Sequence, residues 1–361
     1  MPNKSICFIN SSKSWGGGEK WHYDIATNLN KNDLNIFVIT NKKSELYFKL
    51  KKENIKVFPI KISNTSFLSP FKIFNVTRIL KKENTTTIII NLPADLKVAA
   101  PAAKMAGVKK IIYRRGSAIP VKNKLSNRIL FKFFIDEIIA NSMATKNTIL
   151  AKNPSLFNPE KIKIIYNGVE NSSDNKSYAP IYQRKDNELI IGNAGRFVKQ
   201  KNHKFLIDLA QALTKKNITF KILLAGNGKL KQEIIDYAKE KNVEDKIIFT
   251  GFIENIKHFM HSIDLYILPS LWEGFGYVLV EAMACNKPVI AFNLSSNPEI
   301  IENNKTGFLV EKNNIEETVQ KIELLIKNKE LRKELGKNGH KRVCELFSIE
   351  HTIKNIQEII A

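Results

Sequence analysis

The stretch SLWEGFGYVLVEAMACNKPVIA, from Ser270 to Ala291, contains the local pattern that decides the fold. It begins at the end of the apolar run LYILPS, passes a loop with two glycines, enters a helical pattern near Tyr277 and ends in the apolar run PVIAF. Two short apolar runs joined by a helix are typical of a β-α-β unit in a parallel sheet. Two carboxylates therefore lie close together in sequence, Glu273 in the loop after a strand and Glu281 on the following helix.

The same alternation runs along the rest of the chain. Strand-like runs such as SICFIN, NIFVIT and TTIIINL alternate with helical patterns up to about residue 167, and the pattern restarts with ELIIGNAGRF and FKILLAG. Continuous apolar strands between helices predict parallel sheets that are covered on both faces. Between the two series the chain becomes polar, from Asn167 to Pro180, which predicts a domain boundary there.

We therefore predict an α/β chain of two Rossmann-like, doubly wound domains that face each other across a cleft. The predicted bounds are 1–167 for the first domain and 168–345 for the second. Residues 346–361 are expected to form a C-terminal helix that packs back on the first domain. In doubly wound sheets ligands bind outside the carboxyl ends of the strands, so the loops there are the places to search for chemistry.

The composition excludes several classes of protein. The three cysteines, Cys7, Cys285 and Cys344, have no spacing typical of a metal or redox site and indicate a reducing compartment. The start MPNKSICFIN lacks the apolar core of a signal peptide, and no run reaches the roughly 18 apolar residues needed to span a bilayer. We expect a cytoplasmic protein, with peripheral attachment to the inner face of the plasma membrane as an option.

The formal net charge of +22 is concentrated in the first domain. Residues 1–167 hold 29 Lys and Arg against 10 Asp and Glu, whereas the remainder holds 28 against 25. Such a field attracts nucleic acid, anionic membranes or acidic substrates. No nucleic-acid-binding module matches, so nucleic acid is disfavoured.

Two glycine-containing loops resemble phosphate-binding motifs without matching them. The first loop, Gly16-Gly17-Gly18, follows a strand and opens a helix, which suits either a phosphate or a tight turn. The dinucleotide-binding fingerprint G-x-G-x-x-G needs a further glycine after this loop, but Glu19, Lys20 and Trp21 follow Gly18. In and before the stretch AGNGKLKQ, Leu223 stands where a P-loop needs its first glycine and Leu230 where it needs Ser or Thr, which excludes that site.

Cations and carboxylates also follow strands in the second domain. Arg196 and Lys201, in GNAGRFVKQKNH, can neutralise a pyrophosphate next to helix amides, although a solvated basic turn gives the same pattern. Glu273 and Glu281 can accept hydrogen bonds from sugar and ribose hydroxyls. A glycosidase pair of acid and nucleophile is an alternative, and so is a capping Glu273 with a surface Glu281.

WEGFGYVLVEAMACNKPVIA resembles the E-x7-E region of glycosyltransferase family 4, which contains retaining enzymes of the GT-B fold. SWGGGEKWHYDIATNL is similar to the N-terminal glycine loop and helix of that family, and GRFVKQKNHKFLIDLA to its Gly-Arg and Lys segment. FTGFIENIKHFMHSIDLYILPS and NPEIIENNKTGFLV follow in the family's order. The resemblance thus extends over much of the chain.

The resemblance implies a metal-independent transfer of sugar, without a cofactor, from a nucleotide-diphosphate sugar to a cell-surface glycan, a lipopolysaccharide core or a lipid-linked precursor. It implies that Glu273 contacts the donor sugar and Glu281 the ribose, and that Arg196 and Lys201 neutralise the leaving diphosphate. The implied catalytic residues are Glu273, Arg196 and Lys201, and the implied donor-binding residues further include Gly17, Gly18, Gly274, Phe275, Gly276 and Glu281. No metal ligands are implied.

One segment departs from the family pattern. Where members often carry a histidine after a first-domain strand, this chain has Arg114-Arg115. Arginine cannot act as a base at neutral pH but binds phosphate or carboxylate, so we expect these two residues to contact an anionic acceptor or sugar, with a basic surface cluster as the alternative.

The acceptors that the resemblance implies are often lipid-linked, and the segment Val121–Ile135 mixes Lys and Arg with Leu, Ile and Phe in a helical rhythm. Such a stripe is typical of membrane-interface helices and also of ordinary packing against a sheet. Together with the charge it favours an anionic membrane as a partner of the first domain. A nucleotide-sugar epimerase and a non-catalytic basic binding protein of the same fold remain the alternative functions.

Overall fold

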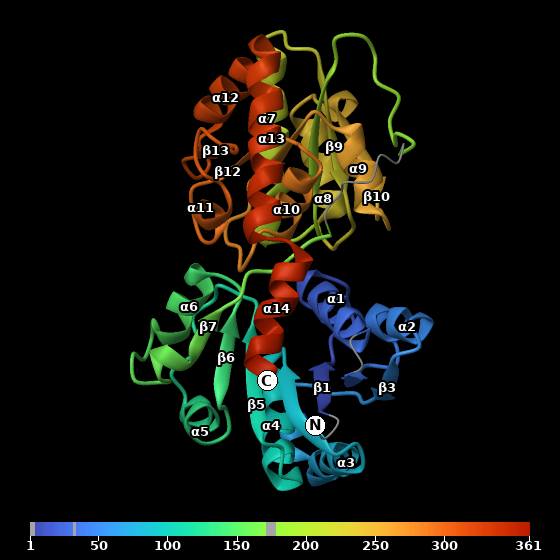
Figure 1. Ribbon diagram of the computed structural model, residues 1–361. Coiled ribbons are helices and arrows are strands. Elements are labelled where there is room, and N and C mark those ends of the chain that lie inside the picture. The colour runs from blue at the N-terminus through green and yellow to red at the C-terminus, as the bar shows by residue number, and fades with distance from the viewer. Residues whose placement is uncertain (1–3, 32–33, 171–177) are drawn as a thin grey trace. The chain divides into compact units, whose positions relative to one another are not determined.

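The computed structural model describes residues 4–31, 34–170 and 178–361. The chain divides into two compact units, unit 1 with Met1–Asn167 and Ile349–Ala361, and unit 2 with Gly168–Ser348 (Figure 1). The chain passes from unit 1 to unit 2 between Asn167 and Gly168 and returns to unit 1 at Ile349, three residues after the predicted start of the C-terminal segment at residue 346. The polar residues 171–177 of the predicted linker lie outside the described residues.

Unit 1 contains a seven-stranded parallel sheet in the order β3-β2-β1-β4-β5-β6-β7. Its strands are β1 (Ser5–Asn10), β2 (Asn35–Thr40), β3 (Lys56–Pro59), β4 (Thr85–Ile90), β5 (Lys110–Arg115), β6 (Glu137–Ala140) and β7 (Ile162–Ile164). The order reverses between β1 and β4, the position at which doubly wound sheets bind ligands.

The helices of unit 1 are α1 (Gly17–Asn30), α2 (Glu45–Lys52), η1 (Ser66–Leu68), α3 (Pro70–Lys82), α4 (Pro93–Ala106), α5 (Leu125–Phe133), α6 (Met143–Leu150), η2 (Pro159–Lys161) and α14 (Ile349–Ile360). One core cluster joins the sheet to the layer formed by α3, α4, α5 and α6. Right-handed crossovers place α1 and α2 on the opposite face, where α14 contacts α1.

Unit 2 contains a six-stranded parallel sheet in the order β10-β9-β8-β11-β12-β13. Its strands are β8 (Leu189–Ala194), β9 (Phe220–Ala225), β10 (Ile247–Gly251), β11 (Leu265–Leu268), β12 (Val289–Phe292) and β13 (Phe308–Val310). Its helices are η3 (Lys199–Lys201), α7 (His203–Lys215), α8 (Lys231–Glu240), η4 (Glu244–Lys246), α9 (Ile256–Ser262), α10 (Tyr277–Ala284), α11 (Asn297–Ile300), α12 (Ile315–Lys327) and α13 (Lys329–Leu346). The predicted class, two doubly wound parallel sheets, is confirmed.

Two breaks divide residues 315–360 into the helices α12, α13 and α14. Asn328 separates α12 from α13, because its side chain accepts the backbone N–H of Leu331 and so caps the second helix. The second break lies at Phe347, whose side chain is fully buried and whose carbonyl accepts the N–H of Val169. Neither a side-chain cap nor a hydrogen bond to a distant residue changes the spacing of apolar residues. The helical spacing of the sequence therefore does not reveal where one of these helices ends and the next begins.

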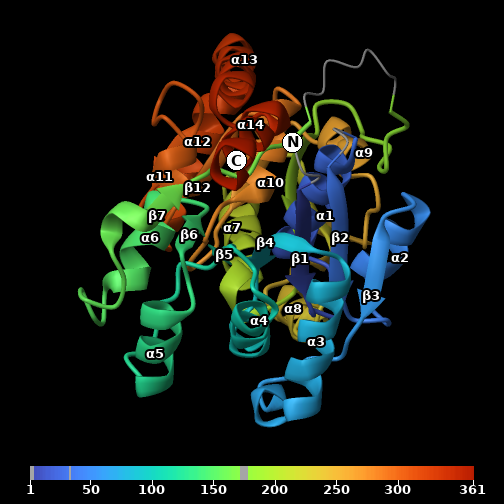
Figure 2. The same cartoon turned by 60° about the horizontal axis from the view of Figure 1, so that its bottom comes forward.

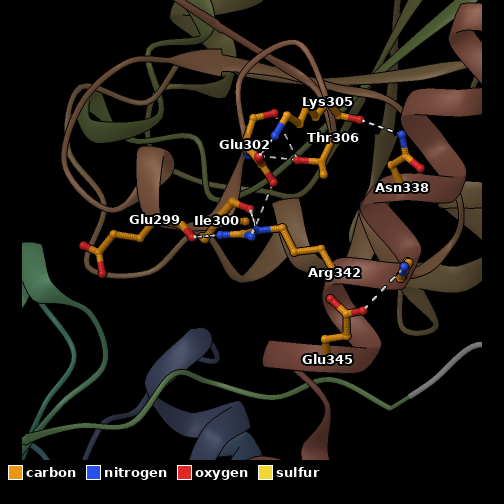
Figure 3. Close-up of polar contacts among 9 residues, drawn as sticks. Glu299, Ile300, Glu302, Lys305, Thr306, Asn338, Arg342 and Glu345 are labelled. Carbon is orange, nitrogen blue, oxygen red and sulfur yellow. Dashed lines mark hydrogen bonds and ion pairs between the residues drawn. The ribbon is translucent and has the colours of Figure 1, made fainter.

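Arg342 of α13 fixes the chain that follows β12 (Figure 3). Its Nε donates to the carbonyl of Ile300 at 2.8 Å, and one terminal nitrogen donates to the carbonyl of Glu299 at 2.9 Å. Asn338 of the same helix donates to the carbonyl of Lys305. The two bonds of Arg342 satisfy carbonyls at the end of α11, which would otherwise lack helical partners. Together with the bond of Asn338 they hold this segment at the carboxyl edge of the sheet.

Candidate functional site

The loops after β8 and β11 are joined by a largely buried ion pair. Lys201 Nζ lies 2.6 Å from Glu273 Oε1, and the two side chains are 15% and 7% exposed. Gln200 donates to the carbonyl of Trp272 at 2.8 Å, and its own carbonyl accepts the N–H of Leu271. Two residues that are 72 positions apart in sequence and were both singled out from it are thus brought into direct contact at the carboxyl edge of the unit 2 sheet.

The start of α10 lies in the same region. Gly276 is the N-cap of the helix, no side chain caps it, and its first turn contains no acidic residue. The partial positive charge at this helix end is therefore not offset by its own sequence, as in anion-binding helix starts. Phe275 is buried edge-to-face against Tyr277 and Phe347, which fixes the loop.

The remaining predicted donor residues lie around this pair. Glu281 is partly buried on α10, and Gly274 is buried in the loop between Glu273 and the helix. Arg196 is exposed, and among the described residues it forms no ion pair, so its guanidinium is available to a ligand. The sequence predicted these positions one by one, whereas the bond between Lys201 and Glu273 required the tertiary structure.

The loops after β8 and β9 approach each other too closely for a side chain at Gly226. This residue has φ +125°, and a Cβ built on it would lie 2.1 Å from the carbonyl oxygen of Gly195, directly before Arg196. Backbone contact at this distance leaves room only for glycine. The position of the Arg196 loop therefore depends on Gly226.

Gly226→Ala is expected to destabilise unit 2 by about 2–3 kcal/mol, because the backbone conformation is strained for alanine and the carbonyl of Gly195 must move. Gly251→Ala is the matched control, since Gly251 also has a positive φ, +73°, but nothing lies within 4 Å of its added Cβ. Urea unfolding of both variants checks the difference. Equal losses in the two variants would contradict the contact with Gly195.

His203, the first residue of α7, lies near Lys201. Its ring stacks on Phe197 with centroids 4.3 Å apart, and burial, together with the nearby positive charge of Lys201, lowers the pKa of His203 to about 4. The ring is therefore neutral at pH 7. The positive charge of this loop therefore comes from its Arg and Lys side chains, which include Arg196 and Lys201.

In unit 1 the glycine loop is packed tightly against the sheet. Gly17 and Gly18 are the first residues of α1, and a Cβ on Gly18 would lie 3.0 Å from the side-chain nitrogen of Asn91, just after β4. The N-terminus of α1 therefore lies at the position where the strand order reverses. This placement agrees with the phosphate role that the resemblance implies for these glycines, which stays a prediction.

Arg114 and Arg115 differ in exposure. Arg114 is 2% exposed, its guanidinium donates to Asn91 and Asn167, and it lies over the ring of Trp21 at 4.5 Å. Arg115 is partly exposed and bonds to the carbonyl of Ile119. Because successive residues of a strand point to opposite faces, only one of the two lies near solvent.

A buried polar cluster beside Arg114 was not singled out from the sequence. His22 donates from Nδ1 to the carbonyl of Gly18, and burial plus the charge of Arg114 lowers its pKa to about 3. Asp95 accepts the N–H and the hydroxyl of Ser11, while burial and the nearby Glu19 raise its pKa to about 6. The only sequence signal was that these residues follow strands or open helices.

No group of three or more His, Cys, Asp or Glu that could hold a metal ion occurs among residues 4–31, 34–170 and 178–361. His258 and His261, which lie on the same helix, both pack against the ring of Tyr178. In the same described ranges, every helix is too short or too polar to cross a membrane.

Comparison with known families gives two matches that together span most of the chain. Residues 15–172 match the family described as Glycosyltransferase Family 4, and residues 174–342 match Glycosyl transferases group 1. The chain is 34% identical over 267 residues to a glycosyltransferase of Methanocaldococcus jannaschii of uncharacterised specificity, with 73% of this chain and 71% of that protein covered.

Two further proteins are similar over a greater length. The chain is 23% identical over 331 residues, 85% of its own length and 84% of the relative, to the UDP-Gal:α-D-GlcNAc-diphosphoundecaprenol α-1,3-galactosyltransferase of Escherichia coli. Its fold is similar to that of Anabaena HepE in a crystal structure with UDP and glucose, with a TM-score of 0.84, 21% identity and 99% of both chains covered.

Proposed function

The chain belongs to glycosyltransferase family 4 and is a nucleotide-sugar glycosyltransferase of the GT-B fold, and from that premise we propose that it transfers a sugar, with retention of configuration, to a lipid-linked glycan precursor. The observation that carries the proposal is the Lys201–Glu273 pair beside the uncapped start of α10. It sets a cation, a carboxylate and a helix N-terminus at one sheet edge, which suits a sugar attached to a diphosphate.

Each part of the donor is assigned to particular residues of unit 2. The amides of Phe275 and Gly276 hold the diphosphate at the positive end of α10. The charge of Lys201 is partly neutralised by Glu273, so Arg196 supplies a second positive charge to the diphosphate. Glu273 accepts from the sugar hydroxyls, and Glu281 accepts from the ribose hydroxyls. The cations stabilise the negative charge that develops on the leaving diphosphate, which is the main electrostatic requirement of the reaction.

The proton of the acceptor hydroxyl goes to a phosphate oxygen of the departing diphosphate. That oxygen gains charge as the bond to the sugar breaks, so its basicity rises when a base is needed. Glu273 then orients the sugar while it accepts the hydrogen bond of Lys201. This assignment does not require a carboxylate with a raised pKa, as a glycosidase acid would.

The donor in the proposal is a UDP-sugar, since Anabaena HepE is described with UDP and the Escherichia coli relative uses UDP-Gal. The acceptor is anionic, and Arg115 is the residue of the arginine pair that contacts it, because Arg114 is buried. An undecaprenyl diphosphate glycan, as the Escherichia coli relative uses, has this charge. It also agrees with the excess of Lys and Arg in residues 1–167.

The donor assignment is tested by titrating purified protein with UDP-, GDP- and ADP-sugars in a calorimeter. We expect the UDP-sugar to bind, and we expect Glu281→Ala and Arg196→Gln each to weaken binding about tenfold or more, as loss of a charge-assisted hydrogen bond does. Lys199→Gln is the control for charge, since Lys199 is an exposed cation of the same loop. Unchanged binding in Glu281→Ala, or no binding of any nucleotide sugar, would refute the proposal.

A further inference from the structure

We propose that η1 and the start of α3 form an apolar wedge, defined as Phe67, Leu68, Phe71 and Phe74, that inserts into the headgroup boundary of an anionic lipid bilayer. The inference deepens the proposed function, on which it rests for the need to reach a lipid-linked acceptor. It assigns the insertion to a different segment from Val121–Ile135, the stretch whose sequence pattern suggested membrane contact.

The wedge is exposed although its side chains are large and apolar. Phe71 and Phe74 are 86% and 65% exposed, and Leu68 and Phe67 are 70% and 42% exposed. The opposite side of α3, with Val76 and Leu80, is packed into the core. A helix that is apolar on both sides needs a second apolar environment, and contiguous exposed patches of this kind mark interaction sites.

The wedge is held in place by its own loop. Ser66 is buried, and its hydroxyl accepts the N–H of Ser63 at 2.8 Å and the ammonium of Lys72 at 2.7 Å. Pro70 opens α3, which fixes the turn between the 3-10 helix and the α-helix. The backbone of the wedge is therefore ordered before binding, so little backbone conformational entropy is lost when the wedge inserts.

The charge around the wedge has one sign. Residues 54–82 contain six Lys and Arg and no Asp or Glu, and residues 96–135 contain ten Lys and Arg and no Asp or Glu. Four acidic residues flank these stretches. Glu83 pairs with Lys56 and Asp136 with Lys104, Asp95 is buried, and Glu53 is exposed and accepts the hydroxyl of Tyr23. Cations around inserted aromatic side chains match the anionic headgroups above the acyl boundary.

A second apolar stripe lies in the same helical layer. Leu125, Ile129 and Phe133 of α5 are 72%, 43% and 61% exposed, and their spacing places them on one side of the helix. Figures 1 and 2 both show α4 between α3 and α5. The two stripes thus belong to one layer of unit 1, and a bilayer is an extended surface that can contact both.

The test is binding of the full chain to vesicles of phosphatidylglycerol and phosphatidylcholine, with pure phosphatidylcholine as the neutral comparison. We expect wild type to sediment with the anionic vesicles only and to be released as salt rises, because screening weakens the attraction. The double variant Phe71→Ser/Phe74→Ser is expected to lower the partition coefficient about tenfold or more, from the apolar area that no longer leaves water.

Insertion is read directly from single tryptophan substitutions. Phe71→Trp is expected to lose fluorescence to lipids brominated on the acyl chains, relative to wild type. Phe48→Trp is the matched control, because Phe48 is 57% exposed on α2, which also carries lysines but lies on the other face of the unit 1 sheet. Quenching at position 48 equal to that at position 71 would overturn the wedge.

Failure of the wedge and failure of the proposed function give different results. If wild type binds anionic vesicles but the Phe71/Phe74 variant binds equally well while Phe133→Ser does not, α5 is the contact and the wedge is overturned. If Phe71→Ser/Phe74→Ser instead breaks a dimer in solution and no vesicles are bound, the patch is an interface between copies and the wedge is likewise overturned. Calorimetric UDP-sugar binding, measured without lipid, decides the donor site separately.

Discussion

Glu273→Ala is expected to lower the rate of sugar transfer by about two to three orders of magnitude and to destabilise unit 2 by about 3 kcal/mol. The first effect follows from the loss of the proposed contact between Glu273 and the transferred sugar in a preorganised site. The second follows because Lys201, whose side chain is 15% exposed, loses the carboxylate that lies 2.6 Å away in the wild-type protein. Donor turnover and urea unfolding measure the two effects.

A double variant separates the two roles of this ion pair. Lys201→Met and Glu273→Leu should each destabilise the protein, whereas Lys201→Met/Glu273→Leu should recover much of the stability, because no unpaired charge is left. Turnover should remain low in all three. Recovery of turnover in the double variant would mean that the pair only holds the two loops together and does not contact the donor.

Asp95→Asn and His22→Gln are expected to change the pH dependence of stability in opposite directions. The pKa of His22 is lowered from 6.5 to about 3, so its contribution to stability is present above pH 6.5 and is lost as the pH falls toward 3. The pKa of Asp95 is raised from 3.8 to about 6, so its favourable contribution is present below pH 3.8 and is lost as the pH rises through 6.

Between pH 6 and pH 3.8 the contributions of His22 and Asp95 to the free energy of unfolding change in opposite directions, so they largely cancel in the wild-type protein. Relative to wild type, His22→Gln should gain about 2 kcal/mol on going from pH 7.5 to pH 4.5, and Asp95→Asn should lose about 2 kcal/mol over the same range. Urea unfolding of each variant against wild type at the same pH cancels the other titrating groups. Curves parallel to that of wild type would show that neither group is shifted by burial.

The candidate site could be predicted in part because each of its residues stands at a recognisable local position. Glu273 and Arg196 follow apolar strands, and the glycines around Phe275 precede a helix. Such positions fix the edge of the sheet at which a side chain lies. They do not fix which side chains touch, and the contact of Lys201 with Glu273 depends on β8 and β11 being neighbours in the sheet.

The arginine pair shows what sequence position leaves open. Arg114 and Arg115 are adjacent at the end of β5, and the sequence suggested one role for both. In the folded unit Arg114 is enclosed by Asn91, Asn167 and Trp21, which come from three other parts of the chain. No local pattern contains those partners, so the burial of one arginine and not the other could not be predicted.

The two doubly wound sheets and the family could be recognised from the sequence alone, because apolar periodicity and motif order are properties of neighbouring residues. The sequence also determined that the excess positive charge lies in residues 1–167. Only the tertiary structure decided which apolar side chains of α3 are left in solvent and which polar groups are buried beside α1. Burial depends on elements that are distant in sequence and meet only in the packed unit, so the Lys201–Glu273 pair and the exposed Phe71 became visible only there.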